Sequence, residues 1–376
     1  MVRPKRSFSS SASQCFGAFC TAAACVAFAL VFLGVTLVHA QTANFRRHKV
    51  SVAKPLTIYF VDVEGGQSTL FVTPSHQSLL VDAGWPDHGG RDADRIMTVV
   101  KQAGLDHIDY FLLTHFHQDH SGGVPNLVKL IHVDNVIDHG TNRETSNAPT
   151  QQAFENYQAA LAHAGAKHIL AQPGESIPLE GLTTTIVSAD GKVIDAPLPG
   201  AGQPNPACKN CPTRPADQTE NARSVGIVMQ YGKMRLVDLG DLTWDREMQL
   251  MCPVNKLGLM DVYVVSHHGW YPSSSPAFVD GIAPRVAIMD NGETKGGSPG
   301  PWEVIEKSPR LKDLWQLHYS DEGGAQHNVA DPYIANLKGA SAGSDGHYIR
   351  LDAYPDGKLV VYNSRTGQSK TYPAAP

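Results

Sequence analysis

Residues 115–120, His-Phe-His-Gln-Asp-His, place three histidines and one aspartate within six positions. Imidazole nitrogens and carboxylate oxygens are the donors that bind zinc and related divalent cations. An apolar run at 108–114 precedes the segment and Gly122-Gly123 follows it, so the pattern predicts a strand that ends in a turn. A surface loop that is rich in histidine by chance is the alternative, but the number and spacing of the ligands favour a metal site.

The spacing within this segment predicts two neighbouring ions. His115 and His117 stand at positions i and i+2, which project to the same side of an extended chain and can share one ion. Asp119 and His120 follow after the chain leaves the strand, and a turn can direct them toward a second ion. Two cations a few ångström apart are the arrangement used in two-metal hydrolysis.

Residues 114–123 resemble the signature of the metallo-β-lactamase-fold hydrolases. Three further segments agree with that family in chain order, at 78–84, 237–241 and 264–269. The resemblance covers roughly 55–362 and implies an α/β (α+β) fold, the four-layer αββα sandwich, over one domain at 55–376. Periodicity alone predicts only a mixture of helices and strands.

The resemblance also implies which of the two metal ions each ligand binds. His115 and His117 are expected on the first ion, Asp119, His120 and His267 on the second, and Asp241 between them. Two cations lower the pKa of a shared water, so that hydroxide is available as the nucleophile, and they take up the charge that develops on the attacked oxygen. Zinc is the expected metal, with manganese or iron as alternatives.

One departure from the family pattern indicates which branch of the family this chain resembles. The larger branches place another histidine ligand just before the strand at 224–231, where this chain has Asn221 and Ser224 and no histidine. This Asn-x-x-Ser resembles the branch of the ComEC extracellular domain and the choline-phosphate esterases. Residues 61–67 resemble that branch's opening motif, but Gln67 replaces its final aspartate. A missing ligand predicts a more open first metal site.

Other polar residues are expected around these ligands. Asp82, and less clearly Asp62, are expected to hold a histidine ring or a loop in place. His139 is a candidate replacement ligand, a substrate contact or an ordinary loop residue. His268, expected to point away from the metals on an extended chain, is a candidate proton donor to the leaving group or a supporting hydrogen-bond partner. Asp119 and His268 are therefore the predicted catalytic residues.

Strand and helix patterns alternate along the chain. Strands are predicted at 56–62, 68–73, 79–82, 133–137, 182–188, 224–231, 234–239 and 262–266, with a final hairpin at 348–362. Helices are predicted at 91–103 and 150–164, and others from 124 and 244. His318 and His327 flank a turn-rich segment and are expected to be exposed loop residues.

Residues 191–221 interrupt this alternation with six prolines and two cysteines, which predicts an inserted loop near the site. Cys208 and Cys211 are expected to form a disulfide within this loop, because their spacing suits a local bridge in an oxidising compartment. Cys252 is then expected to be a buried, unpaired thiol.

The N-terminal residues 1–40 have the pattern of a signal peptide. Three basic residues precede an apolar run, and small residues stand before a predicted cleavage after Ala40. The run is also long enough to span a bilayer, so an N-terminal membrane anchor is the alternative. Either interpretation exports the rest of the chain to the periplasm or beyond the cell, with 41–54 as a flexible N-terminus.

The net charge limits the kinds of molecule that the chain is expected to bind. The chain of 376 residues has a formal net charge of −5, and loss of the three basic residues in 1–40, which contain no acidic residue, makes it −8. Beyond 46–49 no basic cluster stands out, so a face that grips a long nucleic acid is not predicted.

These features favour an exported metal-dependent hydrolase. Phosphodiesters, of the nucleic-acid or the choline-phosphate type, are the preferred substrates because of the branch resemblance. Lactones or β-lactams are the alternative substrates. A di-iron oxidoreductase of the same fold usually has glutamate where this chain has His117. A non-catalytic metal-binding protein is the remaining alternative, and it is at odds with the retention of the full ligand set.

Overall fold

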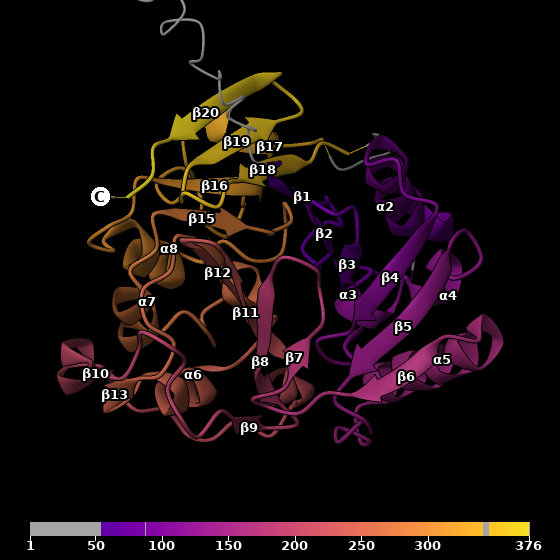
Figure 1. Cartoon of the computed structure of the whole chain (residues 1–376), viewed down its shortest axis with the longest axis horizontal. Helices are drawn as coiled ribbons and strands as arrows, with labels where there is room; N and C mark the ends of the chain where they lie inside the picture. The colour runs from indigo at the N-terminus through magenta and orange to yellow at the C-terminus, as the bar shows by residue number, and fades with distance from the viewer. Residues whose placement is uncertain (1–53, 87, 341–345, 376) are drawn as a thin grey trace, which may run out of the picture. The chain divides into compact units, whose positions relative to one another are not determined.

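The computed structural model describes residues 54–86, 88–340 and 346–375 (Figure 1). The predicted signal peptide at 1–40, and all but the last residue of the predicted flexible segment at 41–54, lie outside the described residues. The described residues belong to one unit by their internal contacts. Within the described part of the chain, no helix is long and apolar enough to cross a membrane.

The first sheet contains nine strands in the order β20-β19-β18-β1-β2-β3-β4-β5-β6. The strands from β20 to β3 pair in antiparallel fashion, whereas β3, β4, β5 and β6 are parallel. Their bounds are β1 Leu56–Phe60, β2 Thr69–Val72, β3 Ser78–Val81, β4 His107–Leu112, β5 His132–Asp138, β6 Lys167–Leu170, β18 Ile349–Ala353, β19 Leu359–Asn363 and β20 Gln368–Tyr372.

The second sheet runs in the order β17-β16-β15-β14-β12-β11-β8-β7, with β9 paired to β8. Strands β12, β14, β15, β16 and β17 are parallel. The bounds are β7 Ser176–Ile177, β8 Thr183–Ala189, β9 Lys192–Val193, β11 Gly226–Tyr231, β12 Met234–Asp238, β14 Val262–Val264, β15 Val286–Met289, β16 Asp313–His318 and β17 Ile334–Asn336. A separate pair joins β10 Gln203–Pro204 to β13 Val254–Asn255.

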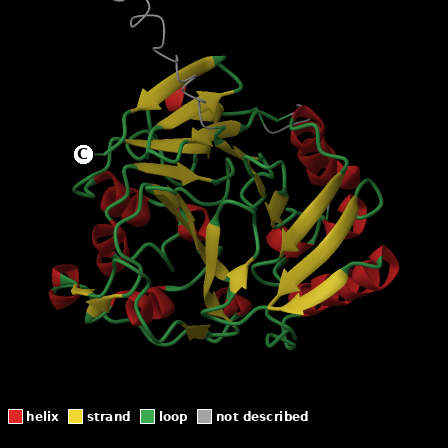
Figure 2. Ribbon diagram, viewed as in Figure 1, coloured by secondary structure: helices red, strands yellow, loops and turns green. Residues whose placement is uncertain are grey.

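Helices lie outside both sheets (Figure 2). The α-helices are α2 Arg91–Gln102, α3 Gln118–Ser121, α4 Val124–Leu127, α5 Ala148–Ala164, α6 Trp244–Met251, α7 Pro276–Ile282 and α8 Pro299–Glu306. The short 3-10 helices are η1 His88–Gly90, η2 Pro206–Lys209, η3 Glu220–Arg223, η4 Ser266–Gly269 and η5 Asp331–Tyr333.

Three apolar cores hold the layers of helices and sheets together. One lies between the sheets and contains Ile58 and Leu79 of the first sheet and Ile227 and Val264 of the second. A second core packs α2, α4 and α5 against the first sheet, and a third packs α6, α7 and α8 against the second. Because each sheet buries both faces, its central strands are apolar on both sides. The predicted αββα sandwich is confirmed.

The predicted insertion at 191–221 contains only short elements, and its cysteine pairing differs from the expectation. Cys208 forms a disulfide with Cys252, 44 residues away, and Cys211 is a buried free thiol. The expected Cys208–Cys211 bridge is therefore wrong. The insertion folds against the end of α6, where Cys252 is the C-cap residue, and this packing brings the distant thiol close.

Candidate metal centre

The segment 115–120 leaves the carboxyl end of β4 and turns into α3. The Nε2 atom of His115 lies 3.1 Å from the Nδ1 atom of His117, so both imidazoles face the same space, as their spacing predicted. His115 is fully buried, whereas the side chain of His117 is 21 % exposed. The centre is therefore open to solvent near His117.

The second sheet supplies the opposing residues from the ends of β12 and β14. Asp241 follows β12, and its Oδ2 atom lies 3.3 Å from Nε2 of His120, 3.3 Å from Nε2 of His267 and 4.0 Å from Nε2 of His115. Its Oδ1 atom lies 3.4 Å from Nε2 of His268. Asp241 thus occupies the central position that a bridging carboxylate would need.

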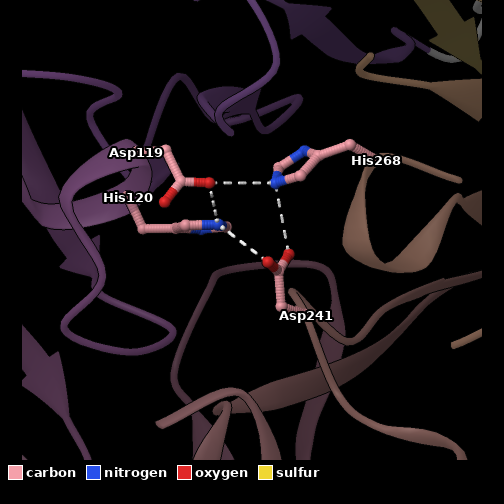
Figure 3. A group of neighbouring side chains, drawn as sticks. All are labelled: Asp119, His120, Asp241 and His268. Carbon is pink, nitrogen blue, oxygen red and sulfur yellow. Dashed lines mark ion pairs between the residues drawn. The ribbon is translucent and has the colours of Figure 1, made fainter. Parts of the chain in front are cut away.

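Asp119, His120, Asp241 and His268 form a buried cluster whose ligand atoms all lie within 4.8 Å of one another (Figure 3). The Oδ2 atom of Asp119 lies 3.2 Å from Nε2 of both His120 and His268. Three inward atoms, Nε2 of His120, Nε2 of His268 and Oδ1 of Asp241, have no hydrogen-bond partner among the described residues. Buried polar atoms are costly without a partner, and this donor set fits a divalent cation.

Three of the histidines have their outer ring nitrogen held by a group on the first-sheet side. Nδ1 of His115 lies 3.1 Å from Oγ1 of Thr114, and Nδ1 of His120 lies 2.6 Å from Oδ2 of Asp82. Nε2 of His117 lies 3.0 Å from Oε2 of Glu144. Such contacts fix a ring's orientation and tautomer, so the other nitrogen stays directed at the metal position.

The two histidines of the second sheet also have a polar neighbour at the outer ring nitrogen. Nδ1 of His267 lies 3.2 Å from Oγ of Ser273, and Nδ1 of His268 lies 3.4 Å from Oδ1 of Asp290. All five histidines therefore present one nitrogen inward, and each has a neighbour at its other nitrogen.

Burial and the carboxylates of Asp119 and Asp241 together determine how the pKa values of the neighbouring histidines shift. Burial raises the pKa of Asp241, but His267 and His268 outweigh that effect and hold it well below its usual range. Burial lowers the pKa of His268, yet Asp241 raises it overall to about 10. Burial lowers the pKa of His267 to about 4 and that of His115 well below its usual value. The buried carboxylates thus attract positive charge into the centre, and a divalent cation would supply that charge.

The positions of His267 and His268 differ from the sequence expectation. His268 was expected to point away on an extended chain, but both residues have left-handed backbone conformations, with φ of 57° and 55°. This turn brings His268, rather than His267, into the cluster with Asp119. His267 instead lies beside Asp241 and Asn221, whose Nδ2 atom is 3.4 Å from Nε2 of His267.

Ser224 and His139 lie around the centre. Oγ of Ser224 is 3.5 Å from Nδ1 of His115, so Ser224 contacts the outer side of that ring. His139 is buried and its Nε2 atom lies 2.9 Å from Oε2 of Glu220. The structure therefore places His139 in a contact with Glu220 and not in the metal-ligand cluster.

The two predicted supporting aspartates have different surroundings. Asp82 contacts His120 directly and accepts hydrogen bonds from the backbone and hydroxyl of Thr114. Asp62 instead pairs with Arg95 at 2.8 Å and lies 2.5 Å from Nε2 of His318. His318, expected to be exposed, is buried because it ends strand β16 within the sheet.

Two residues of the site were not predicted. Glu144 orients His117 from the loop before α5, and Lys295, in the loop after β15, contacts Oδ2 of Asp119 through Nζ. The Lys295 ammonium also lies 5.1 Å from the centre of the Trp85 ring, and its side chain is 27 % exposed. Neither residue belongs to a motif with diagnostic spacing, and only the folded loops bring them to the centre.

Comparisons with known proteins agree with this geometry. Residues 62–204 match the model of the metallo-beta-lactamase superfamily. The chain is 24 % identical over 253 residues to Recombination protein 2 of Haemophilus influenzae and 25 % identical over 248 residues to ComE operon protein 3 of Bacillus subtilis. These regions cover 67 % and 62 % of this chain but only 26 % and 28 % of the relatives. The chain thus spans about a quarter of the length of the curated relatives it matches.

Solved structures similar to this chain share little sequence identity with it. The metallo-beta-lactamase fold protein YhfI from Bacillus subtilis is 12 % identical, with a TM-score of 0.43 over 69 % of this chain and 96 % of that one. Zn(2+)-bound PqqB from Methylobacterium extorquens is 16 % identical, with a TM-score of 0.39 over 68 % and 93 %. The sequence resemblance to the metallo-β-lactamase superfamily and to ComEC-type proteins is confirmed.

Proposed function

This chain carries a metallo-β-lactamase superfamily domain similar to ComEC-type proteins, and we propose that it is an exported metal-dependent hydrolase of phosphodiesters. The observation that carries the proposal is the convergence of five imidazole nitrogens and two carboxylates on one buried space. A purely structural role does not explain why three of these atoms lack a hydrogen-bond partner among the described residues.

The residues divide into two candidate ligand sets that share Asp241. Asp119, His120 and His268 would hold one cation with it, and His115, His117 and His267 the other. When bound, two divalent cations supply an activated nucleophile at neutral pH and stabilise negative charge on the attacked group. Nitrogen and oxygen donors suit Zn²⁺, and Mn²⁺ or iron are the alternatives.

The position of Lys295 favours a substrate with a negative charge. Its ammonium group lies at the partly exposed edge of the centre, next to Asp119. A phosphodiester has a permanent negative charge that this cation can bind, whereas a neutral lactone lacks such a charge. The name of Recombination protein 2 refers to recombination, which involves nucleic acids, and this similarity also favours phosphodiesters. The acidic net charge favours a small or short substrate over a long duplex.

Export is supported by the leader pattern of residues 1–40 and by the Cys208–Cys252 disulfide, since disulfides persist mainly in oxidising compartments. A periplasmic or secreted protein, cleaved after Ala40, is the preferred form, and a protein with an uncleaved N-terminal anchor is the alternative.

The decisive experiment combines metal analysis of the purified protein with assays on a phosphodiester, a lactone and a β-lactam. We expect about two divalent ions per chain and turnover of the phosphodiester. Asp241→Ala should remove at least one ion and reduce turnover on the order of 10³-fold or more. Asp195→Ala, which changes an exposed aspartate in the inserted loop, is the matched control. Full activity of Asp241→Ala would contradict a two-metal mechanism, and turnover of the lactone alone would contradict the phosphodiester assignment.

A further inference from the structure

Two aromatic residues, the half-buried Trp270 and the exposed Tyr271, follow the two site histidines in the chain. The ring of Trp270 lies edge-on to the ring of His267, with 5.2 Å between their centres, and the ring of Tyr271 lies 5.2 Å from that of Trp270. Tyr271 is 55 % exposed and is the only aromatic residue among the exposed large hydrophobic residues of the described chain. An exposed aromatic side chain beside a catalytic centre is a candidate for substrate contact.

The backbone under this pair is held from two directions. Arg214, from the inserted loop, donates a hydrogen bond to the carbonyl oxygen of Tyr271, and its guanidinium lies 3.7 Å from the centre of the Trp244 ring. The backbone N–H of Trp244 donates to the carbonyl of Pro272 at 2.8 Å. These contacts use the backbone of 271–272, and the Tyr271 side chain, which contacts Trp270, stays 55 % exposed.

The inserted loop is itself anchored near these contacts. The Cys208–Cys252 disulfide joins it to the end of α6, and Nε1 of Trp244, the first residue of that helix, donates to the carbonyl of Pro212 at 2.9 Å. The insertion thus fixes Arg214, and through it the chain that carries the aromatic pair. A loop that sequence patterns mark only as irregular therefore positions an exposed ring beside the centre.

The pair reaches the centre through His267, whose ring contacts Trp270. His115, His120 and His268 are fully buried or nearly so, whereas His117 and Lys295 are 21 % and 27 % exposed. The Nε2 atom of His267 lies 3.4 Å from the half-buried Asn221, on the same side of the centre. His267 and Trp270 thus link the centre to the exposed Tyr271 ring.

We propose that Trp270 and Tyr271 form a binding site for an uncharged planar ring of the substrate, of the nucleobase class, next to its phosphodiester. The inference rests on the proposed function, because it places the phosphate at the metal centre. Aromatic side chains bind bases by stacking. Aromatic side chains also bind the quaternary ammonium of choline by cation–π contact. The positive charge of Arg214, at the carbonyl of Tyr271, favours the uncharged ring over that cation.

The test compares two phosphomonoesters that differ in the group attached to phosphate. Thymidine 5′-monophosphate carries a planar base, and phosphocholine carries a quaternary ammonium. Calorimetric titration of the metal-loaded, full-length protein measures the Kd of each. We expect Tyr271→Ala to weaken thymidine 5′-monophosphate binding about 10-fold and to change phosphocholine binding less than about twofold. Tyr271→Phe should keep the wild-type affinity for both, since it keeps the ring.

The control and the contrary outcomes separate the two proposals. Leu259→Ala changes a residue with the same 55 % exposure and should alter neither affinity. If Tyr271→Ala binds thymidine 5′-monophosphate as wild type does, or loses affinity for both ligands equally, the ring site is wrong while the proposed function stands. If the wild-type protein binds neither ligand, the ring site is wrong, and the proposed function is wrong as well only if the phosphodiester is not turned over.

Discussion

His117 lies between the metal centre and the carboxylate of Glu144. Its Nε2 atom is 3.0 Å from Oε2 of Glu144, and its Nδ1 atom faces Nε2 of His115 at 3.1 Å. The hydrogen bond from His117 lowers the pKa of Glu144 to about 2, so this carboxylate is ionised at neutral pH. Glu144 therefore fixes which nitrogen of His117 is available to a cation.

Glu144→Ala is expected to weaken metal binding on the His115 and His117 side about 10-fold to 100-fold. The variant keeps every predicted ligand but releases the His117 ring from its orientation. Competition with a chromophoric zinc chelator measures the affinity. Glu155→Ala, an exposed position on α5, is the control. Wild-type affinity in Glu144→Ala would show that the ring is oriented by other contacts.

Much of the fold could be predicted because local patterns and the family resemblance agree. The apolar run before His115 indicated a strand end, and β4 ends at Leu112. The predicted helix at 91–103 corresponds to α2, Arg91–Gln102, whose buried Ile96, Val99 and Val100 were spaced for one face. Metal ligands at the ends of several parallel strands must converge once the two sheets pack together.

Other parts of the site could not be predicted from spacing. An extended chain would separate His267 and His268 onto opposite faces, but a left-handed turn at both residues directs each toward Asp241. The disulfide joins Cys208 to a thiol 44 residues away because the inserted loop packs on α6. Lys295 approaches Asp119 across 176 positions, and only tertiary structure creates such a contact.

Separate replacements of the two adjacent histidines should distinguish the two ion positions. His268→Gln is expected to lose the ion of the Asp119 cluster and keep the other, whereas His267→Gln should weaken the ion beside His115 and His117. The absorption spectrum of the cobalt-loaded protein and its metal content measure both effects. The exposed His163→Gln, on α5, should keep the full metal content. If His267→Gln instead empties the Asp119 cluster, the ligand assignment made from sequence is the right one.

Loss of the disulfide should destabilise the protein substantially. Closing a loop of 44 residues restricts the unfolded chain, so Cys208→Ala combined with Cys252→Ala should lower the free energy of unfolding by about 3–4 kcal/mol. Urea denaturation measures this change, and peptide mapping under non-reducing conditions identifies the bridge. Cys211→Ala, which removes only the buried thiol, should cost about 1 kcal/mol. A map that pairs Cys208 with Cys211 would contradict the structure.

Glu247 predicts a pH dependence of stability. Its carboxylate is fully buried and accepts the backbone N–H groups of Ser274 and Ser275, at 2.8 and 2.7 Å, where α7 begins. Burial raises the pKa of Glu247 from 4.5 to about 7. Between these values the folded protein keeps a proton that the unfolded chain releases, so raising the pH through this window lowers stability.

The contribution of Glu247 is therefore most favourable below pH 4.5, and its cost is complete above about pH 7. Glu247→Gln removes the titrating group. Its side-chain NH2 group faces one of the two backbone N–H donors, and the loss of that hydrogen bond lowers the stability of the variant at all pH values. Between pH 4.5 and pH 8, the wild-type protein should lose ~2–3 kcal/mol relative to the variant. Urea denaturation of both proteins at the two pH values measures this difference. Other titrating groups contribute equally to both proteins, so their contributions cancel.

The exposed Glu180→Gln is the control, and its stability should change with pH as that of the wild type does. Equal pH profiles for wild type and Glu247→Gln would show that the buried carboxylate titrates near its ordinary pKa.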